Sequence, residues 1–325
     1  MSHVILPPGW RIPEREATPE SVYLGRRDFM KTLGLGGIGA GLILAGCGPG
    51  GDSNAGALPA PPADPTGRYP ARRSPTFRLD RPLTEERVAA AYNNFYEFST
   101  RKEDEARLSR DFRMRPWTLE VGGLVSKPGR FDVDDLIRKM PLEERLYRHR
   151  CVEAWAMAVP WTGFPLAALL RRVEPLPRAR FVRFLSFEEP RTPGMKQTAS
   201  WIPWPYHEGL TIEEATNDLA LLATGIYGHP LPPQHGGPFR LVTPWKYGYK
   251  SAKSIVRIEL TATRPTTLWS QVAPDEYDFL ANVNPAIPHP RWSQATEKMI
   301  STGEKRPTLL YNGYGEFVAG LYKKA

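Results

Sequence analysis

Proline is the feature that most restricts the fold of this chain, because 34 of its 325 residues are prolines. This is roughly twice the usual proportion of about 5%. Proline breaks helix interiors, since its ring clashes with the preceding turn and its nitrogen carries no proton. The proline content therefore argues against a helical bundle and favours short strands, turns and extended loops. The hydrophobic share of 41% and the charged share of 24% indicate a folded globular protein rather than a disordered one.

Residues 1–50 have the pattern of an export signal. Arg26 and Arg27 precede an apolar, glycine-rich run over 33–45, which is shorter than the roughly 20 residues that a membrane-spanning helix needs. A charged start, a short apolar core and small residues at the end are typical of a signal peptide. The arginine pair resembles the signal read by the twin-arginine translocase, which predicts a folded protein exported to the periplasm. The alternative is a chance arginine pair in front of a buried helix.

Cys47 closes this segment in the sequence Leu-Ala-Gly-Cys, which resembles a lipobox. Two interpretations stay open. Either Cys47 is lipidated and anchors the protein to a membrane, or ordinary cleavage leaves it removed or unused. Residues 51–75 form a Gly/Pro/Ala-rich stretch without apolar periodicity, and we predict a flexible linker there.

Residues 76–325 are predicted to form one domain, because they contain no second linker, internal repeat or membrane-spanning stretch. Residues 1–50 hold five Lys or Arg and four Asp or Glu, so +7 of the net charge of +8 lies outside them. Apolar periodicity and capping residues predict helices at 84–92 (begun by Thr84), 131–140, 165–173 and 211–215, and strands at 117–121, 145–151, 180–187, 240–243 and 254–262. This mixture of short helices and short strands predicts an α+β fold class.

Cys151 is the only cysteine of the predicted domain and ends the basic stretch Tyr-Arg-His-Arg-Cys. With two cysteines in the chain, a disulfide scaffold and a four-cysteine zinc site are excluded. Nearby positive charge lowers the pKa of a thiol and favours the thiolate, which is the nucleophile and the metal ligand. We therefore expect a functional cysteine. The alternative is a buried, inert thiol at the end of a strand.

Two further motifs are candidates for ligand binding. Residues 230–255 contain glycines and four cations that suit an anionic, phosphorylated ligand, namely Arg240, Lys246, Lys250 and Lys253. The alternative is a solvated turn between strands. Residues 92–98 (YNNFYEF) combine aromatic side chains with two amides and a carboxylate. They form either a core helix with a wet edge or a grip on a polar ligand.

Taken in order, the motifs resemble one family. The segments YNNFYEF, RHRCVEAW, VPWTGFPL, residues 231–255, APDEYDFLANVNP and HPRWSQATE are similar to those of the catalytic subunits of periplasmic protein-methionine-sulfoxide reductases. The resemblance covers residues 84–320 and the twin-arginine signal. It implies a sulfite-oxidase-like molybdopterin-binding fold, so that 76–325 would be a molybdopterin-binding oxidoreductase domain.

The resemblance also implies a set of cofactor residues. One molybdenum would be held by a single molybdopterin, without an added nucleotide, and by one protein thiolate, which matches Cys151. A soft thiolate suits such a metal. The other matching positions are Asn93, Tyr96, Glu97, Ser186, His235, Arg240, Ser251, Ala252 and Lys253. Ser186 and His235 stand where the family usually has threonine and asparagine.

The implied reaction removes oxygen from methionine sulfoxide residues of oxidised periplasmic proteins, which repairs a reversible lesion. The cofactor carries the oxygen transfer, while the protein supplies position, charge and access. Electrons would come from a membrane haem-b subunit fed by quinol. Trp155 and Tyr247 are candidates for the wall of the substrate opening.

Other functions fit the residues less well. The nearest alternatives are a sulfite dehydrogenase or a small-molecule S- or N-oxide reductase of the same fold. In the sulfite branch Gly-Asn-Arg-Arg typically follows the ligand cysteine, whereas Val-Glu-Ala-Trp follows Cys151 here. A zinc hydrolase is disfavoured because no histidine pair has compact ligand spacing. A non-enzymatic exported binding protein, for nucleic acid in particular, is disfavoured because the basic residues are scattered and no nucleic-acid motif occurs.

Overall fold

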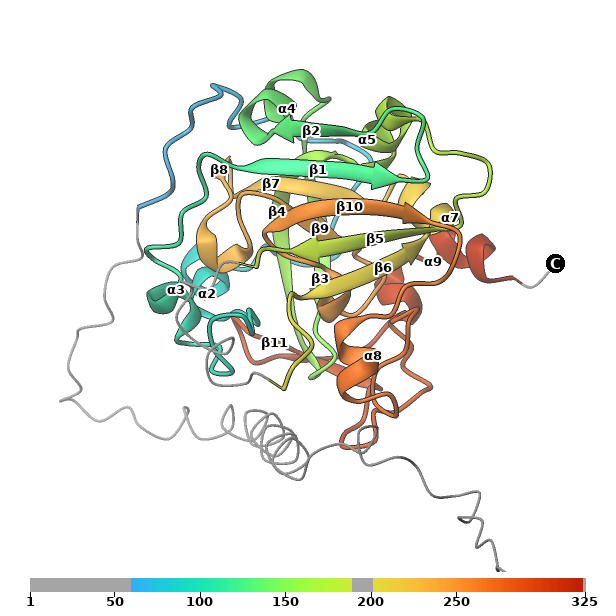
Figure 1. The fold of residues 1–325 in the computed structure, drawn as a ribbon. Helices are drawn as coiled ribbons and strands as arrows, with labels where there is room; N and C mark the ends of the chain where they lie inside the picture. Colours follow the sequence, from blue (N-terminus) through green and yellow to red (C-terminus); the bar gives the residue numbers. More distant parts are fainter. Residues whose placement is uncertain (1–59, 189–200, 324–325) are drawn as a thin grey trace, which may run out of the picture. The chain divides into compact units, whose positions relative to one another are not determined.

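Two β-sheets organise the part of the chain that this computed structural model describes, residues 60–188 and 201–323 (Figure 1). These residues belong to one unit of the chain, 47–325. The predicted signal peptide, the lipobox with Cys47 and the first part of the predicted linker lie outside the described residues.

The first sheet has five strands in the order β2-β1-β10-β5-β6, which run side by side in Figure 1. Neighbouring strands are antiparallel except β1 and β10, which are parallel. Their bounds are Thr118–Gly123 (β1), Gly129–Asp132 (β2), Phe181–Ser186 (β5), His207–Thr211 (β6) and Ile255–Thr261 (β10). Every second residue of β5 is buried, which confirms the strand predicted from alternation at 180–187.

The second sheet follows the order β12-β11-β4-β7-β8, with β3 paired to β4 and β9 paired to β7. Its strands are Glu143–Arg150 (β3), Trp155–Pro165 (β4), Leu221–Ile226 (β7), His229–Pro230 (β8), Arg240–Val242 (β9), Thr296–Met299 (β11) and Lys305–Pro307 (β12). All residues of β4 except Pro165 are buried. No strand is predicted there from the sequence, because a strand that is covered on both faces shows no alternation of apolar and polar residues.

The helices are short and lie at the edges of the sheets. They span Glu86–Ala91 (α2), Glu105–Leu108 (α3), Val133–Lys139 (α4), Leu166–Val173 (α5), Ile212–Thr216 (α7), Leu268–Val272 (α8) and Gly315–Val318 (α9), with 3-10 turns at Pro233–His235 (η4), Gly248–Lys250 (η5), Leu310–Gly313 (η6) and Ala319–Tyr322 (η7). The helices predicted at 131–140 and 211–215 correspond to α4 and α7. Asp132 caps α4, and Thr211 forms a capping box with Glu214 at the start of α7.

The predicted cap at Thr84 is wrong. Helix α2 begins after Glu85, and no side chain caps it. The Thr84 hydroxyl instead accepts a hydrogen bond from the Ala158 N–H (3.1 Å), and the Thr84 N–H donates to Ala158 O (2.8 Å). Thr84 therefore joins the chain before α2 to strand β4.

Residues 60–75 differ from the flexible linker that the composition predicts. The Tyr69 hydroxyl donates to the Thr224 hydroxyl (2.6 Å), and the Ser74 N–H donates to Glu144 O (2.8 Å). The Glu144 N–H donates to Arg72 O (2.9 Å). These contacts attach residues 69–74 to both halves of the second sheet, so the folded part begins before the predicted boundary at residue 76.

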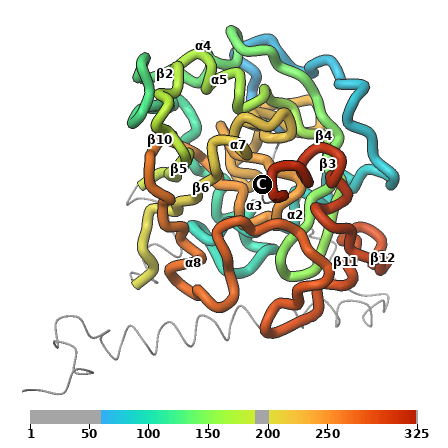
Figure 2. The backbone as a smooth tube through the Cα atoms, turned by 90° about the vertical axis from the view of Figure 1, so that its right-hand side faces the viewer, coloured from blue at the N-terminus to red at the C-terminus, as the bar shows by residue number. Residues whose placement is uncertain are grey.

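The C-terminal turns lie against the same sheet, as Figure 2 shows for the segment beside β3 and β4. The Tyr314 hydroxyl accepts a hydrogen bond from the Arg148 N–H of β3 (2.9 Å), and the Asn217 side chain donates to Phe317 O (3.0 Å). Among residues 60–188 and 201–323, no helix has the length and apolar character that a membrane crossing requires. The mixed sheets and short helices confirm the α+β class.

Candidate active site

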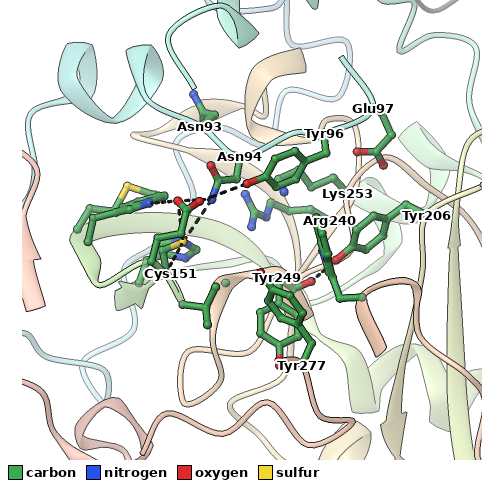
Figure 3. A pocket seen from close by; sticks show the side chains of 17 residues that line it. Asn93, Asn94, Tyr96, Glu97, Cys151, Tyr206, Arg240, Tyr249, Lys253 and Tyr277 are labelled. Atoms are coloured by element: carbon green, nitrogen blue, oxygen red, sulfur yellow. Dashed lines mark hydrogen bonds between the residues drawn. The ribbon is translucent and has the colours of Figure 1, made fainter. Parts of the chain in front are cut away.

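Cys151 lies in a tight loop between β3 and β4. Its N–H donates to Trp155 O (2.9 Å), and the Ala154 N–H donates back to Cys151 O (3.1 Å). Ala154 has a φ of 66°, a left-handed conformation that turns the chain sharply. The cysteine is buried and lines a pocket (Figure 3). The loop therefore presents one thiol to the pocket.

Segments far apart in the sequence build this pocket, and Figure 3 shows how their side chains converge. The segment before α3 and the β3–β4 hairpin form one side, and the chain after β9 forms another. The lining residues are Asn93, Asn94, Tyr96, Glu97, His149, Cys151, Val152, Glu153, Trp155, Met157, Tyr206, Arg240, Gly248, Tyr249, Lys253, Trp269 and Tyr277. The walls thus combine aromatic rings with an equal number of amide and charged side chains.

Glu153 is the centre of a polar network beside the thiol. Its carboxylate forms a buried ion pair with Lys102 (3.0 Å) and accepts hydrogen bonds from the Trp155 indole (3.2 Å) and the Tyr96 hydroxyl (3.4 Å). The Glu153 Oε2 atom lies 3.7 Å from the Cys151 Sγ atom. A carboxylate is therefore fixed next to the sulfur. With Asn94, four side chains hold it in position.

Asn94 connects this network to the thiol directly. Its side-chain amide donates to Cys151 Sγ (3.2 Å) and to Glu153 Oε2 (3.4 Å). The amide thus bridges the sulfur and the carboxylate. A neutral donor at this distance can stabilise negative charge on sulfur.

The basic flank of Cys151 does not activate the thiol as predicted. Arg148 turns to Asp80 (3.0 Å) and to Asn312 O (2.8 Å), while Arg150 pairs with Glu297 (3.4 Å). Burial raises the pKa of Cys151, and the charge of Glu153 raises it further. The free thiol is therefore protonated at neutral pH, and a bound metal ion would have to displace its proton.

His149 is neutral for the same physical reason. Burial lowers the pKa of His149 to about 3, and the positive charge of Arg240 adds to this shift. The histidine therefore adds no charge beside Cys151 at neutral pH. The effect predicted from the sequence fails because burial outweighs the neighbouring charge at both His149 and Cys151.

Arg240 and Lys253 supply positive charge to the pocket. Burial lowers the pKa of Arg240 to about 9 and that of Lys253 to about 8. Within residues 60–188 and 201–323, neither forms an ion pair with a carboxylate: Arg240 donates to His235 O (3.0 Å) and lies 4.6 Å from the Trp161 ring centre. Arg240 is a buried cation without an acidic partner, which is costly unless an anion neutralises it. Lys253 is half-buried, and the charges of Glu97 and Glu105 act on it. The pocket is thus suited to an anionic ligand.

Of the ten residues that the resemblance implies, the structure brings six to the pocket wall and leaves four beside it. The six are Asn93, Tyr96, Glu97, Cys151, Arg240 and Lys253. The other four support the wall. Ser186 donates its hydroxyl proton to Lys253 O, and His235 accepts from Arg240. Ser251 and Ala252 form the turn before Lys253, in which Ala252 O accepts from the Leu241 N–H (2.8 Å).

Lys246 and Lys250 do not belong to this cation group, although both were candidates. Lys246 forms a buried ion pair with Glu214 (2.5 Å), and Lys250 forms one with Glu208 (2.9 Å). Lys250 also donates to Phe279 O. Both lysines therefore hold parts of the protein together, and neither lines the pocket.

Several features of the pocket fit a polar ligand. The Asn94 Oδ1 and His235 Nδ1 atoms are buried and have no hydrogen-bond partner in the described part of the chain. Buried polar atoms are normally satisfied, so a ligand can supply what they lack. At Gly236, with a φ of 88°, a Cβ atom would lie 2.5 Å from the Lys253 side chain. The glycine therefore lets this cation approach the backbone closely.

Sequence reasoning missed other residues of the pocket. Asn94 and Glu153 stand inside motifs that were singled out, so their neighbours were a signal for them. Trp155 lines the pocket as expected, whereas Tyr247 lines a neighbouring groove. Tyr277 stands in the quoted segment APDEYDFLANVNP. Lys102, Tyr206 and Trp269 carry no local signal, because only the fold brings them near Cys151.

Within the two described ranges, no group of three or more His, Cys, Asp or Glu side chains is arranged to hold a metal ion. The arrangement needed for the zinc-hydrolase alternative is therefore not found there. One thiolate suits a metal whose remaining ligands belong to a cofactor.

Comparison with known proteins agrees with this geometry. The family model of the oxidoreductase molybdopterin binding domain matches residues 107–269. This range includes Cys151, Arg240 and Lys253, and it excludes residues 92–98. Among solved structures, the sulfane dehydrogenase SoxCD from Paracoccus pantotrophus is similar, with a TM-score of 0.42 and 19% sequence identity. That match covers 62% of this chain and 47% of the SoxCD chain, so this chain spans about half of its length.

Proposed function

Since the chain belongs to the oxidoreductase molybdopterin binding domain family, with a sulfite-oxidase-like fold and a molybdenum–molybdopterin cofactor, we propose that it reduces methionine sulfoxide residues in proteins. The observation that carries this proposal is the Glu153 carboxylate beside the Cys151 sulfur. The position of this carboxylate bears on the charge of the substrate, whereas the family membership establishes the cofactor.

The residues of the pocket fit this cofactor. Cys151 would hold the metal, and the buried Arg240 and the half-buried Lys253 would hold the anionic part of the pterin. Asn93, Tyr96 and Glu97 would contact the pterin from the opposite segment. When bound, the cofactor supplies oxygen-atom transfer and two electrons. The chain positions it and limits what can approach.

Glu153 disfavours an anionic substrate next to the thiol. A sulfite dianion would meet a fixed carboxylate, whose charge Lys102 offsets in part, and like charges repel at short range in a buried site. A sulfoxide is neutral and polar, so it avoids this repulsion. The aromatic rings of Trp155, Trp269 and Tyr277 suit the apolar methyl and methylene groups that flank the sulfur of methionine sulfoxide.

The reaction balances with two electrons and two protons. The sulfoxide loses its oxygen atom and becomes a thioether, and the oxygen leaves as water. We propose that a membrane haem-b subunit fed by quinol supplies the electrons. We also propose export to the periplasm through the twin-arginine translocase, where oxidised proteins would be the substrates.

The test compares two substrates on the holoenzyme, purified with its cofactor and supplied with a reduced dye. We expect reduction of a denatured, methionine-oxidised protein and negligible oxidation of sulfite. The opposite pattern would make the chain a sulfite dehydrogenase, and activity confined to small sulfoxides or N-oxides would also refute the proposal. Cys151→Ser should lose molybdenum and activity together, measured by elemental analysis and by dye oxidation.

A further inference from the structure

A second cavity, of about 240 Å³, adjoins the Cys151 pocket. We call it the side groove. Val152, Tyr249 and Tyr277 line both cavities, so the two share a wall. The remaining side of the groove comes from residues 274–294, which include Asp275 and Ile287. A ligand that reaches the thiol from this direction would extend into the groove.

Exposed apolar side chains occur on two segments, one of which lines the groove. Of the five large apolar residues exposed in 60–188 and 201–323, four lie on the two segments 280–287 and 309–311. These four are Leu280, Ile287, Leu309 and Leu310. The segments are joined by the Tyr311 N–H, which donates to Val283 O (2.7 Å). Ile287 is 65% exposed and lines the groove itself. Clustered apolar surface of this kind marks an interaction site.

The wall of the groove is held in place before any ligand arrives. The Tyr247 N–H donates to Ala281 O (2.7 Å), and Lys246 donates to Leu280 O (2.6 Å) and to Asn282 (3.0 Å). On the other side Arg291 pairs with Glu276 (2.7 Å). A preformed groove loses little conformational entropy when it binds a ligand.

The rim of the groove carries acidic side chains. Asp275, Glu276 and Asp278 all line it, and only Glu276 forms an ion pair with a cation among the described residues, namely with Arg291 (2.7 Å). Asp275 and Asp278 are exposed. The rim is therefore negative, and it favours a basic ligand over an acidic one.

We propose that the side groove binds the residues next to methionine sulfoxide in an unfolded polypeptide, with an apolar side chain against Ile287 and basic side chains near Asp275. This inference rests on the proposed function and specifies its substrate. An unfolded chain exposes the apolar residues that a native protein buries, so it can satisfy the groove and reach the pocket at the same time. The groove thus selects damaged, unfolded proteins.

The test uses holoenzyme with the variants Ile287→Glu and Asp275→Lys. The matched control is Leu83→Glu, which makes the same kind of apolar-to-acidic change on the surface. Leu83 is 38% exposed, as is Leu280, but it lines neither cavity. The probes are free methionine sulfoxide and fluorescent peptides with one methionine sulfoxide flanked by Leu and Lys, or by Ser and Glu. Dye-driven kinetics give kcat/KM, and fluorescence anisotropy gives the Kd of each peptide directly.

We expect Ile287→Glu to lower kcat/KM for the Leu/Lys peptide about tenfold relative to free methionine sulfoxide, as loss of an apolar anchor does. Asp275→Lys should reverse the preference between the two peptides, and Leu83→Glu should behave as wild type. Equal peptide affinity in wild type and Ile287→Glu would overturn the inference. So would a defect confined to electron delivery by the quinol-fed partner, which would make the groove a docking site for that subunit.

The two proposals fail in different ways. If wild-type holoenzyme reduces no sulfoxide, the proposed function fails while the anisotropy measurement still tests the groove. If wild type reduces the peptides but Ile287→Glu leaves their kcat/KM ratio to free methionine sulfoxide unchanged, the groove fails and the function stands.

Discussion

The variant Lys246→Met tests whether Lys246 stabilises the fold through a buried ion pair or binds the ligand as a cation. The sequence groups Lys246 with the cations of residues 230–255, whereas the structure pairs it with Glu214 at 2.5 Å in the protein interior. Lys246 also donates to Leu280 O (2.6 Å) and Asn282 Oδ1 (3.0 Å). If these contacts are the function of Lys246, the substitution should lower the free energy of unfolding and leave cofactor binding intact.

The size of the effect follows from the charge left behind. Glu214 is 1% exposed, and removing one member of a buried ion pair costs about 3–5 kcal/mol because the other charge stays unpaired. Glu214 keeps hydrogen bonds from the Thr211 N–H (3.0 Å) and the Tyr322 hydroxyl (2.6 Å). We therefore expect a loss near the lower limit, about 3 kcal/mol. For a domain of this size, that lowers Tm by roughly 6–12 °C.

The assay is urea unfolding of the cofactor-free chain, followed by tryptophan fluorescence. Lys127→Met is the matched control, because Lys127 pairs with Glu174 at 2.5 Å on the surface and such pairs contribute at most about 1 kcal/mol. The double variant Lys246→Met/Glu214→Leu should recover most of the loss, since it leaves no buried charge. Unchanged stability together with loss of bound pterin would refute the structural role of Lys246 and would support a role as a ligand-binding cation.

Two further predictions concern the surroundings of the pocket. Gln294→Leu removes a hydrogen bond to Val152 O (2.8 Å) and another from Arg150 (2.8 Å). We expect the free energy of unfolding in urea to fall by about 1–3 kcal/mol. We also expect an altered Mo(V) electron paramagnetic resonance spectrum, because Cys151 would be displaced, and an unaltered spectrum would contradict this positioning role of Gln294. Burial lowers the pKa of His235 to about 3, so below pH 6.5 only the unfolded chain takes up its proton, and stability falls by about 1.4 kcal/mol per pH unit until the folded chain titrates. His235→Asn should remove this slope between pH 6 and pH 4, and equal slopes in the two proteins would show that His235 is protonated when folded.

Local motifs identified residues that line one pocket where those residues are contiguous in the sequence. Residues 92–98 and Cys151 were singled out from short segments, and the structure brings both to one pocket. Charge was misjudged because ion pairs join distant residues: nothing near Lys246 in the sequence indicates Glu214, and nothing near Arg150 indicates Glu297. The basic flank of Cys151 shows the same limit, since burial outweighs neighbouring charge.

The fold was predicted in part for a similar reason. Strand β5 alternates because one face of it is covered, whereas β4 is covered on both faces and therefore reads as a uniform apolar run. The α+β class could be predicted from proline content and short elements. The order of strands in the two sheets could not, since pairing depends on contacts between segments with no shared local signal.

The buried cations tie cofactor binding to stability, and Arg240→Met tests this link. Arg240 is 3% exposed and pairs with no carboxylate among the described residues, so the cofactor-free chain bears the cost of burying its charge. An anionic cofactor binds only the folded chain and offsets that cost. Arg240→Met should therefore leave the cofactor-free chain as stable as wild type or more stable, and should lessen the stabilisation that the cofactor provides. Thermal unfolding of both proteins with and without cofactor measures the two effects, and a cofactor-free variant that is markedly less stable than wild type would refute the argument.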